Sequence, residues 1–260
     1  MKTRAVSMIL LMIASALAGC TGTDGADGAD GRDGADGADG QDGKDFEQPE
    51  INLYQANLEE ASLALVDLSN ANLSYANVQN TDLRYANLSG ADLSYANIKF
   101  SELNNADLSY ANLSYADLLL SNLMGVNLRS ANLHAIHGID LRGCPDSLPQ
   151  LWICIGGQEP LSRYYLIGPT ANLSNAYLAG ANLTGADLTS ADLTGTDLVW
   201  ANLSNANLSN ANLSNAYLAG ANLTGADLTS ADLTEVNWHY TTCPDGTNSD
   251  DNGNTCENNL

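Results

Sequence analysis

The chain has 260 residues and carries 31 acidic against 9 basic side chains, which gives a formal net charge of −22. So large a negative excess repels nucleic acid, and the composition therefore excludes a nucleic-acid-binding protein. Phe occurs only twice, and the apolar fraction of 44% comes mostly from Ala and Leu. A conventional aromatic-rich core is excluded in favour of a thin, repeated one.

Residues 1–19 have the features of a signal peptide. Lys2 and Arg4 precede the apolar run VSMILLMIASALA, which is short for a membrane span. The run ends in Leu17-Ala18-Gly19-Cys20, which resembles a bacterial lipoprotein lipobox. The resemblance implies cleavage before Cys20, lipidation of Cys20 and anchorage in the cell envelope. Because Thr rather than Asp follows, it favours the outer membrane of a Gram-negative bacterium; a secretory peptide with a coincidental cysteine stays open.

Residues 20–45 follow as an acidic, glycine-rich segment with eight Gly-x-Asp triplets between Gly22 and Asp45. Glycine at every third position is what a collagen triple helix requires, but the segment contains no proline. Two interpretations stay open. The segment is a flexible, self-repelling tether of a monomer, or it is a collagen-like stalk that joins three chains.

Aliphatic residues recur at every fifth position through most of the chain. They run from Leu53 to Leu133, 17 in succession, and then through 13 leucines from Leu173 to Leu233. On an α-helix a five-residue step would spread these side chains around every face, and along a straight strand it would alternate them between two faces. The spacing instead predicts a solenoid in which Leu, and the Ala two residues before it, point inward from a short extended segment that a turn follows.

The acidic residues predict the length of one coil. Side chains one coil apart lie about 4.8 Å apart, where two carboxylates repel by about 1 kcal/mol even in water. A coil one pentapeptide shorter would stack Asp67 on Asp82, and one pentapeptide longer would stack Asp67 on Asp92. A coil of about 20 residues leaves one clash, Asp82 over Glu102, and elsewhere alternates acid with amide. We therefore predict an all-β solenoid with four sides.

The repeated unit Ala-Asn/Asp-Leu-x-x over 51–133 and 171–238 resembles the pentapeptide-repeat family. The resemblance implies a right-handed quadrilateral parallel β-helix, and it supplies the handedness that the spacing leaves open. It also implies a non-enzymatic protein, and nothing in the sequence places a base beside a nucleophile.

These patterns divide the remaining chain into a first solenoid half at 46–135, an interruption at 136–170, a second half at 171–238 and a polar tail at 239–260. The separation between Leu133 and Leu173 equals two predicted coils, so the two halves agree in phase. We predict a distorted part of the same solenoid with a projecting loop, in which 139–141 and 164–166 each run inward, outward, inward. A flexible joint between two solenoids stays open.

Four cysteines remain once Cys20 is assigned to lipid. Local pairing, Cys144 with Cys154 and Cys243 with Cys256, is the simplest of three connectivities outside the cytoplasm. We expect the tail to cap or flank the last coil, whose open end would otherwise expose leucines and unpaired backbone.

Neither cysteine region is predicted to hold a metal or a cofactor. His134 and His137 lie near the first cysteine pair, but the spacing is not that of a zinc site. Residues 248–253 resemble half of a calcium loop, with Asn259 where a bidentate Glu belongs.

One candidate binding site follows from the coil length. Tyr75, Tyr95 and Tyr115 are each one predicted coil apart and should stack as a ladder on one edge, either as structural support or as a platform for a sugar ring or an apolar protein edge.

The function predicted from the sequence is an envelope scaffold that presents acidic and tyrosine-bearing faces to a protein or glycan. The alternatives are an adhesive or structural protein trimerised by the Gly-x-Asp segment and, remotely, a DNA-mimicking gyrase-binding protein, which the export signal opposes.

Overall fold

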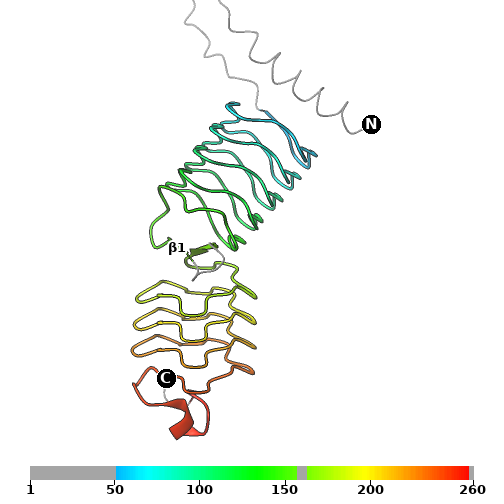
Figure 1. Ribbon diagram of the computed structural model, residues 1–260. Coiled ribbons are helices and arrows are strands. Elements are labelled where there is room, and N and C mark those ends of the chain that lie inside the picture. The colour runs from blue at the N-terminus through cyan, green and yellow to red at the C-terminus, as the bar shows by residue number, and fades with distance from the viewer. Residues whose placement is uncertain (1–50, 157–162, 258–260) are drawn as a thin grey trace, which may run out of the picture. The chain divides into compact units, whose positions relative to one another are not determined.

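The computed structural model describes residues 51–156 and 163–257, and from Asn52 onward the chain forms one compact unit. The predicted signal peptide, the lipidation site Cys20 and the Gly-x-Asp segment lie outside the described residues. Figure 1 shows the described chain as stacked coils, which run from blue to green in the first array (residues 51–135) and from yellow to red in the second array (residues 171–242).

Parallel backbone bridges define the length of one coil. They join Asn52 with Asn72 and Asn172 with Asp192, and the same offset of four pentapeptides recurs through both arrays. Between bridges the N–H of most central leucines donates to a carbonyl of the next coil, as from Leu208 to Asp227 at 2.7 Å. Each coil therefore consists of four consecutive pentapeptides, the length that the acidic residues predicted.

The core consists of two side chains from each pentapeptide. The central leucines and the alanines two residues before them are almost completely buried, as at Ala71, Leu73, Ala206 and Leu208, each at most 1% exposed. Because every coil contributes a similar set, burial is spread evenly along the arrays, and no single large cluster of aromatic residues is required.

Each corner of the coil is a four-residue turn with one left-handed residue. The N–H of Ala56 donates to the carbonyl of Leu53 at 2.9 Å, and Gln55 between them has a φ of 54°. A positive φ at the third residue is what a type II turn requires. Oδ1 of Asn52 accepts a hydrogen bond from the N–H of Tyr54 at 3.0 Å. The repeated Asn or Asp before leucine therefore fixes the entry into each turn.

Five hydroxyl side chains replace alanine inside the coil without leaving an unsatisfied polar group. Oγ1 of Thr81 donates to the carbonyl of Leu58 at 2.8 Å, in the preceding coil. The same offset recurs at every other buried Ser or Thr in an alanine position, namely Ser101, Ser121, Thr196 and Thr241. These hydroxyls thus add hydrogen bonds between neighbouring coils.

The interruption begins as a continuation of the solenoid and ends as an antiparallel hairpin. The coil register persists to the bridge between Asn127 and Ser147. The chain then forms β1 (Ile153–Gly156) and β2 (Tyr164–Ile167), which pair antiparallel. The disulfide Cys144–Cys154 links the last part of the coil to β1.

The expectation that 164–166 runs inward, outward, inward is wrong. Tyr165 is 1% exposed and Leu166 is fully buried, whereas Tyr164 is only half-buried. Tyr165 and Ile167 belong to the core cluster of the second array, while Leu166 packs against Gly138. Both faces of β2 are thus covered by protein, and the strand does not follow the one-sided pattern of the coil.

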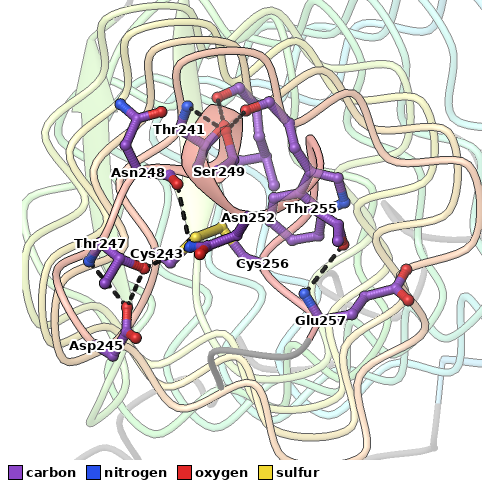
Figure 2. Close-up of a disulfide and its surroundings, with 12 residues drawn as sticks. Thr241, Cys243, Asp245, Thr247, Asn248, Ser249, Asn252, Thr255, Cys256 and Glu257 are labelled. Atoms are coloured by element: carbon purple, nitrogen blue, oxygen red, sulfur yellow. Dashed lines mark hydrogen bonds between the residues drawn. A yellow bond between two sulfur atoms is a disulfide. The ribbon is translucent and has the colours of Figure 1, made fainter.

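The tail closes the end of the second array, as Figure 2 shows. The coil register continues past residue 238, because Thr242 still bridges Asn222. Cys243 is fully buried and pairs with the fully buried Cys256. Between them the short 3₁₀ helix η2 (Ser249–Asn252) places Ser249 in the core, where its hydroxyl donates to the carbonyl of Trp238. The last coil is therefore covered, as a capping tail requires.

Leu208 and Ser209 test the assignment of inward and outward positions. Leu208→Ala should lower the free energy of unfolding by about 2–5 kcal/mol, because it removes a fully buried side chain. Ser209→Ala removes one partly exposed hydrogen bond to Asn207 and should cost about 1 kcal/mol or less. Urea denaturation measures both, and equal losses would contradict the assignment.

The two disulfides give a second prediction. Non-reducing peptide mapping should recover Cys144 linked to Cys154 and Cys243 linked to Cys256, and a free thiol or a cross-pairing would refute the local pattern. Replacing both Cys243 and Cys256 by Ala should lower the free energy of unfolding by about 2–3 kcal/mol, since the denatured chain loses a closed loop.

Candidate interaction surface

Three tyrosines form a ladder on one corner of the first array. The rings of Tyr75 and Tyr95 lie 4.7 Å apart between centroids and 4° from parallel, and those of Tyr95 and Tyr115 lie 4.7 Å apart and 3° from parallel. Each ring remains about half exposed, at 47–51%. The coil register brings these three residues together, as their spacing of one coil indicated.

Both ends of the tyrosine ladder are closed by further rings. Tyr54 meets Tyr75 edge-on at 5.9 Å, and His134 meets Tyr115 edge-on at 5.2 Å, with Nε2 of His134 3.2 Å from the Tyr115 hydroxyl. The spacing of one coil did not predict the roles of Tyr54 and His134, because each stands one residue before the corner position of its pentapeptide. The sequence does contain a signal for them: at each end of the tyrosine column an aromatic residue directly follows the central leucine instead of standing two residues after it.

The stacking determines which part of each ring is accessible. Neighbouring rings cover the faces of Tyr95, so the ladder presents ring edges and phenol hydroxyls. This geometry differs from the expected flat platform for a sugar ring, which would need an uncovered ring face. Partial burial, together with Tyr115 and Tyr75, raises the pKa of Tyr95 above its usual value, and its hydroxyl therefore remains protonated at neutral pH.

The ladder also occupies a demanding backbone position. Tyr75, Tyr95 and Tyr115 have φ values of 58°, 57° and 59°, in the left-handed region that favours Gly and Asn. A bulky side chain in this backbone region destabilises the fold by about 1 kcal/mol or more. Each stacked pair of rings stabilises it by about 0.5–1.5 kcal/mol and so offsets that strain.

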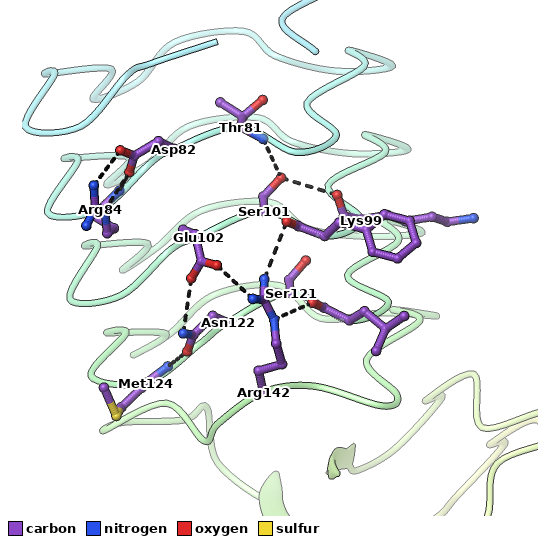
Figure 3. A network of polar contacts seen from close by, with 12 residues as sticks. Thr81, Asp82, Arg84, Lys99, Ser101, Glu102, Ser121, Asn122, Met124 and Arg142 are labelled. Atoms are coloured by element: carbon purple, nitrogen blue, oxygen red, sulfur yellow. Dashed lines mark hydrogen bonds and ion pairs between the residues drawn. The ribbon is translucent and has the colours of Figure 1, made fainter. Parts of the chain in front are cut away.

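The one acidic clash that the register leaves is neutralised by two arginines, as Figure 3 shows. Asp82 pairs with Arg84 at 2.8 Å, and Glu102 pairs with Arg142 at 2.7 Å. The hydrogen bond from Arg84 lowers the pKa of Asp82 below its usual value. Arg142 also donates to the carbonyl of Leu120 and thereby ties the interruption to the first array.

A second charge cluster lies on another side of the first array. Asp117 accepts from Nζ of Lys99 at 2.8 Å and from Nδ1 of His137 at 3.0 Å. Burial raises the pKa of Asp117, but the bonds from His137, Lys99 and the backbone of Leu119 outweigh it and bring the pKa to about 2. The arrangement is a structural ion pair between coils.

The described residues contain no group of His, Cys, Asp and Glu that could hold a metal ion. Cys144 and Cys154 are joined in a disulfide and offer no thiolate beside His134 and His137. In the tail, Asn248 caps η2 by accepting from the N–H of Asp250, and Asn252 donates to Thr247. Asn259 lies outside the described residues. None of the helices in the described part of the chain could cross a membrane.

The family model for pentapeptide repeats matches residues 51–144 and 171–237 in overlapping segments, with eight copies. The chain therefore belongs to the pentapeptide-repeat family, whose members form right-handed β-helices and are generally non-enzymatic structural or interaction proteins. Nothing in the described geometry points to catalysis. No curated protein matches the chain.

Several solved pentapeptide-repeat structures are similar to the chain. HetL from Nostoc sp. strain PCC 7120, a protein involved in heterocyst differentiation regulation, is 31% identical over 76% of this chain and 92% of HetL, with a TM-score of 0.25. The fluoroquinolone-resistance protein QnrB1 is 18% identical over 72% of this chain and 88% of its own, with a TM-score of 0.34. A protein of the Arabidopsis thaliana thylakoid lumen is 23% identical over 60% and 66%, with a TM-score of 0.24.

The depressed pKa of Asp117 predicts how stability changes with pH. A carboxyl group whose pKa falls on folding stabilises the protein at pH values above its pKa in the unfolded chain, which is about 4. This stabilisation disappears as the pH falls to the folded pKa of about 2. Wild-type protein should exceed Asp117→Asn in free energy of unfolding by at most about 2 kcal/mol near neutral pH, and the difference should vanish at the acidic end. Urea titrations across this range measure it; a difference independent of pH would contradict the assignment.

Proposed function

We propose that the protein is a non-enzymatic lipoprotein of the cell envelope that holds an acidic pentapeptide-repeat scaffold at the membrane surface. The observation that carries the proposal is the lipobox-like Leu17-Ala18-Gly19-Cys20, followed by the tether and then by the repeats. Several acyl groups on Cys20 would anchor the protein stably in the membrane, whereas a single acyl group would not. The outer membrane of a Gram-negative bacterium is the proposed location.

The disulfides support an address outside the cytoplasm. Cys144–Cys154 and Cys243–Cys256 are both local, and disulfides persist mainly in oxidising compartments. This chemistry also bears on the remote alternative of gyrase binding by DNA mimicry. An exported, lipid-anchored protein would not meet a cytoplasmic enzyme.

Palmitate labelling with cell fractionation tests the location. The full chain should incorporate label and separate with the outer membrane, whereas a Cys20→Ser variant should lose both properties. Label that survives the substitution, or a wild-type chain found in the cytoplasm, would refute the proposal. Native mass measurement of the wild-type protein separates the monomeric scaffold from the alternative of three chains joined through the Gly-x-Asp segment.

The tyrosine ladder is the proposed contact surface for a partner protein, because its stacked rings present edges and hydroxyls and leave no open face for a sugar ring. It combines half-exposed ring edges with phenol hydroxyls on a surface otherwise rich in Asn, Asp, Ser and Thr. Tyr side chains offer a large rigid area together with one hydrogen-bonding group, which suits recognition.

Two triple variants at Tyr75, Tyr95 and Tyr115 separate binding from structural support. Replacing all three by Phe keeps the stack and removes the hydroxyls, so the melting temperature should change little while binding to intact cells weakens by at least about fivefold. Replacing all three by Ser should also lower the melting temperature, because the stacked contacts are lost. Normal cell binding by both variants would leave the ladder with a structural role alone and refute its role as a contact surface.

A further inference from the structure

The second array carries an uncompensated negative charge. Residues 171–242 contain six acidic side chains and no Lys or Arg. In the first array Asp82, Glu102 and Asp117 each have a cationic partner, whereas none of the six acids of the second array forms an ion pair with a described residue. This part of the surface therefore attracts cations through charges that the chain itself does not neutralise.

One side of the second array combines this charge with exposed aromatic rings. Three successive coils read AYLAG, TDLVW and AYLAG at 176–180, 196–200 and 216–220. The parallel bridges place Asp197 between Tyr177 and Tyr217 in one column. By the same register, Trp200 stands between Gly180 and Gly220 at the corner.

The glycines leave the indole of Trp200 open on one face. Its ring lies over Gly220, where an added Cβ would approach the indole to 2.3 Å. Gly180, on the preceding coil, is exposed and offers no side chain to cover the other face. Trp200 is 69% exposed, compared with 47–51% for the ladder tyrosines, and no other described ring stacks on it. It differs from the ladder in presenting a ring face.

Asp197 supplies a carboxylate from the same pentapeptide as Trp200. Oδ1 accepts from the N–H of Val199 at 3.1 Å, a bond that holds the side chain at the start of the turn leading to Trp200. Tyr177 and Tyr217, on either side of the Asp197 position, are 56% and 51% exposed. The surface formed by Tyr177, Asp197, Trp200 and Tyr217, here the Trp200 patch, thus joins an aromatic face to a fixed acid.

We propose that the Trp200 patch binds an arginine side chain of a basic partner polypeptide. A guanidinium stacks on an aromatic face and forms charge-assisted hydrogen bonds with a carboxylate, and Trp is the preferred ring for such contacts. The absence of any Lys or Arg from the second array means that no cation of the array competes for the patch. This surface is separate from the tyrosine ladder and goes beyond the proposed envelope function.

Calorimetric titration of the full chain in detergent tests the proposal, with an oligoarginine peptide and an oligolysine peptide of equal length as probes. Oligoarginine should bind more tightly than oligolysine, because only the planar guanidinium both stacks and forms paired hydrogen bonds. Trp200→Ala should weaken oligoarginine binding by at least about fivefold, and Asp197→Asn should act in the same direction while keeping the bond to Val199.

Two controls distinguish the Trp200 patch from net charge and from the ladder. Asp187→Asn removes an equal charge from another side of the second array and should change the affinity by less than about twofold. The Tyr75/Tyr95/Tyr115→Phe variant leaves the Trp200 patch intact and should bind oligoarginine normally. The proposal for the Trp200 patch can therefore fail while the ladder proposal holds, and the reverse. Equal binding of the two peptides, equal losses for Asp187→Asn and Asp197→Asn, or Trp200-dependent binding of a neutral oligosaccharide in place of oligoarginine would overturn the proposal.

Discussion

The structure depends on backbone hydrogen bonds that hold each coil to the next at a fixed offset of four pentapeptides. Bonds such as Leu93 N–H to the carbonyl of Asn112, at 2.7 Å, run along every side of the first array. Once this register is set, every outward side chain acquires neighbours of known identity above and below it. The columns of acid, amide and aromatic residues, and both proposed contact surfaces, follow from that one constraint.

The same constraint explains why so acidic a chain can fold into closely spaced coils. Amides of one coil donate to carboxylates of another, as Asn87 does to Asp67 at 3.0 Å and Asn127 to Asp107 at 2.9 Å. Asn and Asp also serve equally well as acceptors at the start of each turn. The turn geometry thus leaves the choice between them open, and repulsion between coils decides it.

The repeating parts of the molecule could be predicted from the sequence. The inward leucines follow from the five-residue spacing, the coil length follows from the positions of the acidic residues, and the two together align Tyr75, Tyr95 and Tyr115. The predicted inward, outward, inward pattern at 164–166 was wrong, because β2 is covered on both faces and does not follow the one-sided pattern of the coil. The sequence alone also could not show that the tyrosine rings stack face to face, since ring orientation depends on side-chain rotamers. The open face of Trp200 depends on two glycines in other coils, which become relevant only after the register is known.

The most direct test of this account is a measurement of scalar couplings across the backbone hydrogen bonds by NMR. The amide nitrogen of Leu93 should couple to the carbonyl carbon of Asn112, and that of Leu113 to the carbonyl carbon of Asn132. Couplings to carbonyls one pentapeptide nearer or further along the chain would contradict the four-pentapeptide register and, with it, the columns on which both contact surfaces depend.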